Sequence, residues 1–270
     1  MKYISSRDNA SFKVLHLLAR SARERRKQGR TVLDGPHLVE AYVRRIGQPL
    51  LLATSERGLA QEEIRRLVDH HRGSRPTLFS DALFAEISPV ETPTGLLALI
   101  DIPETRAPQP IASTCVVLDA VQDAGNVGSI LRSAAAAGVP LVLLSEGCAQ
   151  AWSPKTLRAA MGAHFDLTLV ERAHVASLLA NYSGRVLATR LDRGESLFDL
   201  DLAGPVAWLF GSEGAGLTME LAALAGGTVR IPMPGAAESL NVAAAAAICL
   251  FEQVRQREAP ISGKSARRGG

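Results

Sequence analysis

Apolar residues in the first hundred positions alternate between short runs typical of buried strands and longer amphipathic stretches typical of helices. The amphipathic stretches predict helices over 11–27, 36–45, 61–71 and 81–87. The short apolar runs predict strands over 31–34, 50–54, 77–79 and 94–100. Pro36 suits the first turn of a helix, and Ser80 suits an N-cap. We therefore expect residues 1–102 to form a small α/β/α domain of their own.

The segment 103–113 breaks this pattern. It has no apolar periodicity and contains Pro103, Pro108 and Pro110 among polar residues. Such a composition is typical of an interdomain linker.

From Cys115 the alternation begins again with longer units. Strands are expected over 115–119, 141–144, 167–170, 185–188, 206–210 and 228–231. Helices are expected over 127–137, 154–161, 173–180, 218–225 and 240–255. Strands that alternate with helices in this way require a parallel sheet covered on both faces. Residues 114–258 are thus expected to form a second α/β domain, followed by a basic flexible tail at 259–270.

The bulk composition excludes several protein classes. No apolar run approaches the ~20 residues that a membrane-spanning helix needs. The N-terminus also lacks the hydrophobic region of a secretory signal, so a cytoplasmic protein without a membrane partner is expected. The cysteines, Cys115, Cys148 and Cys249, stand far apart without a CxxC pair, and we expect no metal site.

Positive charge is concentrated near the N-terminus. The net charge is +3, but residues 1–50 hold eleven Lys or Arg and four Asp or Glu, so they carry +7 and the remaining residues carry −4. The densest run spans 20–30, and it fits either phosphate-backbone contacts or an ordinary solvated helix end. The candidate RNA contacts in this run are Arg23, Arg25, Arg26, Lys27 and Arg30. Few aromatic residues are present, which argues against a base-stacking platform.

Three glycine-containing turns follow predicted strands in the second domain, at 123–128, 211–216 and 231–241. Because the carboxyl ends of parallel strands meet at one edge of a sheet, these turns predict one composite ligand pocket. The glycine order of the second turn is not the GxGxxG of a nicotinamide site, and the chain has no GKS or GKT phosphate loop.

The helix after the first turn carries a candidate functional arginine. At 100° per residue, one stripe of this helix is apolar and expected to be buried: Val127, Ile130, Leu131 and Ala134. Gly128 and Arg132 are expected to face away from that stripe. Asn126 could cap the helix and Gly138 could end it. Arg132 is then either simply solvated or placed to grip a phosphate or a ribose hydroxyl.

The third turn leads into a helix built on a run of alanines, 243–247. Ser239 is a plausible N-cap for this helix. The small side chains permit close packing against a crossing segment or a partner helix, although an ordinary helix of high propensity would look the same.

Taken in order, the three turns resemble the signature motifs of the SpoU (TrmH) family of RNA ribose 2′-O-methyltransferases. The residues that carry the resemblance are Asn126, Arg132, Glu213, Ser239 and Asn241. The segment 153–163 is similar to a further family segment, and 32–40 resembles the family's L30e-like substrate-binding domain. Ala124 departs from the proline of many members, which alters the stiffness of the turn and no reacting group.

The resemblance implies a SPOUT fold, with a parallel sheet and a deep C-terminal trefoil knot, in a homodimer that binds S-adenosylmethionine. The implied catalytic residues are Arg132, Asn126, Glu213, Ser239 and Asn241. The implied cofactor contacts are Phe210, Gly211, Glu213, Gly216, Ile231, Met233, Ser239 and Leu240. Lys155 and Arg158 join the expected RNA contacts. The substrate is expected to be structured RNA, ribosomal before transfer RNA, and a non-catalytic ribosome-assembly factor is the alternative of another class.

A ribose 2′-hydroxyl is a poor nucleophile, so positioning and stabilisation of the developing alkoxide should dominate methyl transfer. Arg132 suits that role better than the role of a general base, because a guanidinium loses its proton only at a large cost. We expect Asn126 and Ser239 to orient Arg132.

Overall fold

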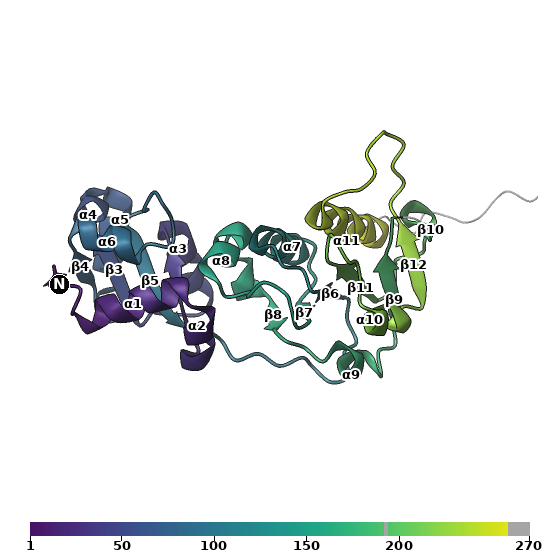
Figure 1. Cartoon of the computed structure of the whole chain (residues 1–270), viewed down its shortest axis with the longest axis horizontal. Helices are drawn as coiled ribbons and strands as arrows, with labels where there is room; N and C mark the ends of the chain where they lie inside the picture. The colour runs from purple at the N-terminus through teal and green to yellow at the C-terminus, as the bar shows by residue number, and fades with distance from the viewer. Residues whose placement is uncertain (192–193, 259–270) are drawn as a thin grey trace, which may run out of the picture.

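The computed structural model describes residues 1–191 and 194–258, which form two α/β units side by side (Figure 1). The first unit contains a five-stranded sheet in the order β1-β4-β3-β5-β2, and the second a seven-stranded sheet in the order β10-β12-β9-β11-β6-β7-β8. This arrangement confirms the expected α/β class. The basic tail expected at 259–270 lies outside the described residues.

The N-terminal unit is an α/β/α layer, as its sequence pattern predicts. Helices α1 and α6 pack on one face of the sheet, and α3 and α5 pack on the other. The predicted helix over 11–27 is two helices, because Ser21 adopts an extended backbone and its side chain caps the second by accepting from the Glu24 amide. The elements are β1 (Lys2–Ile4), α1 (Ala10–Arg20), α2 (Ala22–Gln28), β2 (Arg30–Asp34), α3 (Pro36–Arg45), β3 (Leu51–Ser55), α4 (Glu56–Ala60), α5 (Glu62–His70), η1 (Arg72–Ser74), β4 (Thr77–Phe79), α6 (Asp81–Ile87) and β5 (Leu96–Asp101).

The C-terminal unit confirms the parallel sheet, since every neighbouring pair of its strands is parallel. Helices α7, α8 and α11 cover one face, and α9 and α10 cover the other (Figure 1). The elements are β6 (Cys115–Asp119), α7 (Ala124–Ala136), β7 (Leu141–Leu144), α8 (Pro154–Ala160), η2 (Ala163–Asp166), β8 (Thr168–Val170), α9 (Val175–Leu179), β9 (Arg185–Thr189), β10 (Glu195–Ser196), η3 (Leu197–Asp199), β11 (Val206–Gly211), α10 (Met219–Leu224), β12 (Gly227–Arg230) and α11 (Val242–Glu258).

The strand order reverses between β6 and β11. Strands β6, β7 and β8 run in sequence to one edge, after which the chain crosses to the other side of β6. The last residues of the two strands at the reversal, Asp119 and Gly211, are register partners. The turns that follow β6 and β11 therefore leave the sheet side by side, at the place where open α/β sheets bind their ligands.

The two units pack directly against each other. Thr31 Oγ1 donates to the Trp152 carbonyl oxygen at 2.7 Å, and the Tyr42 ring meets Phe165 edge-on, with the ring centroids 5.4 Å apart. The described chain has no helix or strand between β5 and β6, yet Ile111 in this connection is only 1% exposed and belongs to the second core. The connection thus packs on the domain that it precedes, and the two units also contact each other directly.

Helices α7 and α8 approach closely at Gly128. A Cβ on this glycine would lie 2.5 Å from the Ala159 Cβ and 2.7 Å from the Thr156 carbonyl oxygen. The expectation that Gly128 faces away from the core is therefore wrong, because the second buried side of α7 is its contact with α8. Arg132, by contrast, is exposed as expected.

No helix within residues 1–191 and 194–258 is long and apolar enough to cross a membrane. In the same part of the chain, no group of three or more His, Cys, Asp and Glu side chains could hold a metal ion.

Candidate active site

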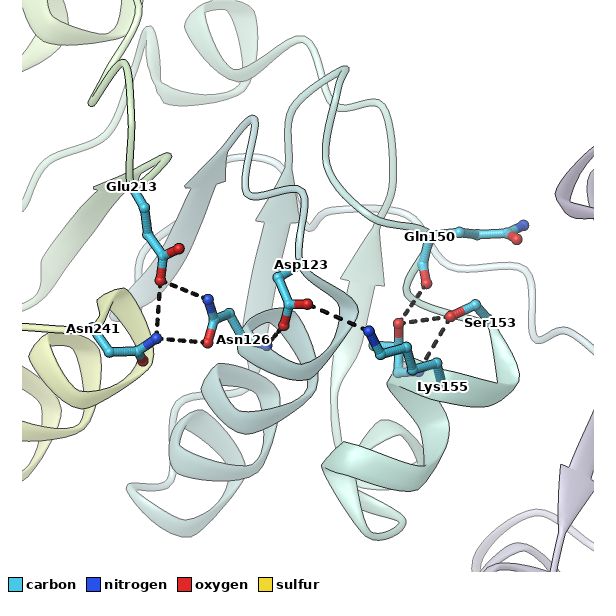
Figure 2. Close-up of polar contacts among 8 residues, drawn as sticks. Asp123, Asn126, Gln150, Ser153, Lys155, Glu213 and Asn241 are labelled. Carbon is cyan, nitrogen blue, oxygen red and sulfur yellow. Dashed lines mark hydrogen bonds and ion pairs between the residues drawn. The ribbon is translucent and has the colours of Figure 1, made fainter. Parts of the chain in front are cut away.

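Side chains from all three glycine-containing turns meet at the carboxyl edge of the large sheet. The Asn126 Nδ2 atom donates to Glu213 Oε1 at 2.8 Å, and Asn241 Nδ2 lies 2.9 Å from both Asn126 Oδ1 and Glu213 Oε1. Figure 2 shows this closed set of contacts, which we call the motif triad. Residues that are far apart in sequence thus form one cluster, as the composite-pocket expectation requires.

The first turn positions Asn126 through the start of α7. Asp123, and not Asn126, is the N-cap of this helix, because its Oδ1 atom accepts from the Asn126 amide at 2.8 Å. The expectation that Asn126 caps the helix is wrong, and its carboxamide is free to join the motif triad. The hydrogen bond from the Asn126 amide, with the nearby Lys155 ammonium, lowers the pKa of Asp123, so this cap stays ionised.

The second turn positions Glu213 on a tight loop. Ser212 and Gly216 exchange two backbone hydrogen bonds, of 3.0 and 2.9 Å, which close the loop. A Cβ on Gly211 would lie 2.2 Å from the Gly216 carbonyl carbon, and Gly216 itself has a φ of 69°. Both positions therefore require glycine, and the loop presents Glu213 to Asn126 and Asn241.

The third turn ends at the cap of α11. The Asn241 Oδ1 atom accepts from the Ala243 amide at 2.9 Å, so Asn241 is the N-cap of this helix. The expectation that Ser239 is the cap is wrong. Ser239 is exposed and makes no hydrogen bond with any residue that the structure describes.

Arg132 lies on α7, beyond the motif triad. Its side chain is exposed and forms no hydrogen bond or ion pair with the described residues. The expectation that Asn126 and Ser239 orient it is wrong, because the Asn126 carboxamide is bonded to Glu213 and Asn241. The guanidinium is therefore available to a ligand.

The expected cofactor contacts occupy the ends of β11 and β12, which flank β9. Phe210 is fully buried in the core and offers only its backbone to a ligand. Ile231, Met233 and Leu240 are half-buried. The region between β12 and α11 projects from the body of the unit as a long loop (Figure 1).

Asp119 is a buried carboxylate beside the first turn that the sequence analysis did not single out. It is 2% exposed, its Oδ1 atom accepts from Ser145 Oγ at 2.8 Å, and its Oδ2 atom accepts from the Thr218 amide at 2.7 Å. One buried carboxylate thus joins the ends of β6 and β7 to the start of α10. The sequence does contain a signal for this residue, because Asp119 is an acidic residue at the end of an apolar strand, just before the first motif.

The predicted RNA contacts divide into exposed and structural groups. Arg25 is only 5% exposed, and its guanidinium donates to the Leu18 carbonyl oxygen at 2.7 Å and to Gln150 Oε1 at 2.8 Å. The prediction that Arg25 contacts RNA is therefore wrong, because this side chain is used to join α1, α2 and the second unit. Arg30 pairs with Asp101 at 2.9 Å. The remaining predicted contacts are exposed: Arg23, Arg26, Lys27, Lys155 and Arg158.

Comparison with known proteins agrees with this geometry. The sequence profile of the SpoU rRNA Methylase family matches residues 113–251. The chain is 34% identical, over 257 residues, to the 23S rRNA (guanosine(2553)-2′-O)-methyltransferase RlmP of Bacillus subtilis (strain 168), with 93% of this chain and 98% of that relative covered. It is 31% identical, over 276 residues, to the 23S rRNA (uridine(2479)-2′-O)-methyltransferase of Streptomyces viridochromogenes, with 97% and 94% covered.

Among solved structures, the SpoU methyltransferase AviRb from Streptomyces viridochromogenes in complex with AdoMet matches with a TM-score of 0.82 at 28% identity, covering 95% of this chain and 100% of that one. The sequence profile, the full-length relatives and the shared fold confirm the resemblance found in the motifs. The chain belongs to the SpoU rRNA methylase family.

Proposed function

We propose that this protein transfers a methyl group from S-adenosylmethionine to a ribose 2′-hydroxyl of ribosomal RNA. The observation that carries the proposal is the motif triad, in which Asn126, Glu213 and Asn241 lock three separate turns together at one edge of the sheet. The 23S rRNA ribose methyltransferases named above support the choice of reaction and of RNA.

The residues at the ends of β11 and β12 fit the cofactor. Gly214 and Gly216 have open space where a Cβ would stand, so their backbone is accessible to a ligand. The half-buried Ile231, Met233 and Leu240 provide apolar surface for an adenine ring. When bound, the cofactor supplies an electrophilic methyl group; the protein holds it and excludes water.

The chain's own task is to align the ribose oxygen and to stabilise the charge that develops on it. Arg132, exposed and without a partner among the described residues, is placed to bind the oxygen as its proton leaves, or an RNA phosphate beside it. The motif triad does not touch Arg132. The motif triad instead fixes the turn before α7, and thereby the helix that carries the Arg132 guanidinium.

The N-terminal unit serves as an L30e-like RNA-binding domain at 1–102, joined by the linker 103–113 to the catalytic domain at 114–258. Helix α2 carries exposed cations in the N-terminal unit, and α8 carries exposed cations in the C-terminal unit. The two units contact each other, in part through the hydrogen bond from Arg25 to Gln150. Phosphate contacts by Arg23, Arg26 and Lys27 would therefore hold RNA at a fixed distance from the methylation site.

A second copy of the chain completes the enzyme. Phe251 is 47% exposed on α11, and the alanine run before it leaves room for a partner helix. Helix α11 also contacts α7, which carries Arg132, so this homodimer contact would lie near the methylation site. We place the deep trefoil knot of the family in the segment from β12 to α11, whose projecting loop reaches the motif triad at Asn241.

The proposed role of Arg132 is tested with ribosomal RNA from a strain that lacks this gene. Wild-type protein and S-adenosylmethionine should create one linkage resistant to alkali, since a 2′-O-methyl group removes the nucleophile for cleavage. Arg132→Ala and Arg132→Lys should each lose at least about a hundredfold in rate, with unchanged cofactor affinity. Wild-type rates in both variants would remove Arg132 from the reaction.

The dimer is tested by sedimentation. Phe251→Glu should convert a dimer to a monomer, because it introduces a charge into an apolar contact. Leu17→Glu, at an apolar side chain 41% exposed on α1, is the matched control and should leave the dimer intact. A wild-type monomer would contradict the arrangement.

A further inference from the structure

A hollow of about 410 Å³ lies at the carboxyl ends of β6, β7 and β8, beside α9 and α10. Its polar lining residues are Asp119, Ser145, Glu146, Arg172, His174, Thr218 and Glu220. The motif triad does not line it, nor do the expected cofactor contacts. The hollow lies beside the reversal of strand order between β6 and β11, where open α/β sheets hold ligands, and the proposed function leaves it without a role.

The hollow continues toward the N-terminal unit. A second hollow of about 290 Å³ shares Ser145, Glu146 and Arg172 with the first, and Arg26 of α2 lines it. Because the two hollows share these three residues, we treat them as one groove, the β7–β8 groove, between the basic helix α2 and the switch point of the large sheet.

The groove has fixed walls. The Asp119 carboxylate holds Ser145 and the Thr218 amide in place, as described above. Arg172 adopts a left-handed backbone with a φ of 52°, and its guanidinium pairs with Glu146 at 2.8 Å. A non-glycine residue in this conformation is strained, and such strain concentrates at functional sites.

The lining selects the chemistry of the occupant. Carboxylates disfavour a free phosphate in the larger hollow, and its polar walls disfavour an apolar ligand. Glu220 is exposed at the rim and makes no hydrogen bond or ion pair with the residues that the structure describes, so its carboxylate can accept from an amino group. Arg172 and Arg26 lie along the groove in the direction of α2. A nucleobase with an amino group, followed by its phosphate, matches this sequence of acceptors and cations.

We propose that the β7–β8 groove binds single-stranded RNA next to the methylated nucleotide. One base enters the larger hollow and donates its amino group to Glu220, and the backbone passes Arg172 and Arg26 toward α2. A volume of several hundred Å³ is in the range of small-ligand sites, and sequence-selective proteins read splayed single-stranded bases in this way. The assignment rests on the proposed function for its choice of RNA as the ligand.

The test measures binding of the full chain to oligocytidine and oligouridine decamers by fluorescence anisotropy. Cytosine has an amino group where uracil has a carbonyl, and the two strands carry equal charge. Wild-type protein should bind oligocytidine at least about tenfold more tightly, which is the lower end of the effect of one hydrogen bond to a charged group. Glu220→Ala should abolish this preference. Equal binding of both strands by the wild type would overturn the proposal.

The charge effect of the same variant provides a second check. Simple electrostatics predicts that Glu220→Ala strengthens binding of both strands equally, and a retained cytosine preference with that result would overturn the proposal. Arg172→Ala should weaken binding of both strands by about tenfold. Arg65→Ala, at an exposed arginine on α5, is the matched control and should change neither strand's affinity.

Calorimetry with S-adenosylmethionine separates this inference from the proposed function. Arg172→Ala and Glu220→Ala should leave cofactor affinity unchanged, and loss of cofactor binding in either would make the groove part of the cofactor site and overturn the proposal. A wild-type protein that prefers oligocytidine but binds no S-adenosylmethionine would refute the methyltransferase function while leaving the groove as an RNA site.

Discussion

Gly128→Ala tests the close contact between α7 and α8 on which the position of Asn126 depends. In an isolated helix this change stabilises by about 1 kcal/mol, because alanine has the higher helix propensity. Here the new Cβ would stand 2.5 Å from the Ala159 Cβ, 2.7 Å from the Thr156 carbonyl oxygen and 3.0 Å from the Ala160 amide nitrogen. Two of these three atoms belong to the backbone and cannot rotate away, so the helices must move apart.

Overpacking of this kind costs about 1–3 kcal/mol, and backbone contacts place Gly128→Ala at or above the upper end of that range. After the gain in propensity is subtracted, we expect a net loss of about 2 kcal/mol in the free energy of unfolding. Urea unfolding followed by circular dichroism measures it. Ser129→Ala, at the next and exposed residue of the same helix, is the matched control and should be neutral or slightly stabilising.

The same variant should also lose activity. A helix α7 displaced from α8 moves Asn126, two residues before the substitution, away from Glu213 and Asn241. The rate of methyl transfer should therefore fall by more than the loss of folded protein at the assay temperature explains. A Gly128→Ala protein as stable as its parent, or more stable, would refute the tight α7–α8 contact, since the packing cost would then not exceed the gain in helix propensity.

Three further changes test other parts of the structure. Burial lowers the pKa of His164 to about 4 from an ordinary 6.5, so the native state resists protonation of this side chain. The resulting contribution to the free energy of unfolding is complete above the unfolded pKa, and stability should therefore fall by about 2 kcal/mol from pH 7 to pH 5. Urea titrations at the two pH values should show that His164→Gln removes this loss. Arg25→Met should lower the free energy of unfolding by about 2 kcal/mol, because it leaves buried carbonyls without a donor, and the folded fraction should keep its RNA affinity. Arg23→Ala should instead weaken RNA binding and leave the free energy of unfolding unchanged. Asn241→Asp keeps the cap of α11 but places a second carboxylate against Glu213. The rate of methyl transfer should fall at least about tenfold, while the unfolding midpoint stays nearly constant. Undiminished activity would show that the motif triad is dispensable.

The layers and the parallel sheet were predictable because most strands are short apolar runs and most helices have an apolar stripe, unlike α2 and β10. The exceptions have local causes. Strand β1 (Lys2–Ile4) was missed because only Ile4 of its three residues is buried, so no apolar run marks it. The break between α1 and α2 was missed because Ser21 ends one helix and caps the next without a glycine or proline.

The sequence predicted that Asn126, Glu213 and Asn241 would meet, but not that Arg132 and Ser239 stay apart from them, and it predicted less well what each residue does. Asp123 and Asn126 are both good capping residues, and only the backbone at the start of α7 decides between them; the same holds for Ser239 and Asn241 before α11. Arg25 was indistinguishable in sequence from its exposed neighbours, because burial of one side of α2 depends on the second unit. Asp119 joins elements that are adjacent only in the folded sheet.

Hydrogen exchange with saturating S-adenosylmethionine tests most directly whether the turns after β11 and β12 form one cofactor site. Backbone amides in 211–216 and 231–241 should exchange more slowly together when the cofactor is present, and those in 145–150, which line the β7–β8 groove, should not change. Unchanged exchange in both turns, or protection confined to 145–150, would contradict the site described for this protein.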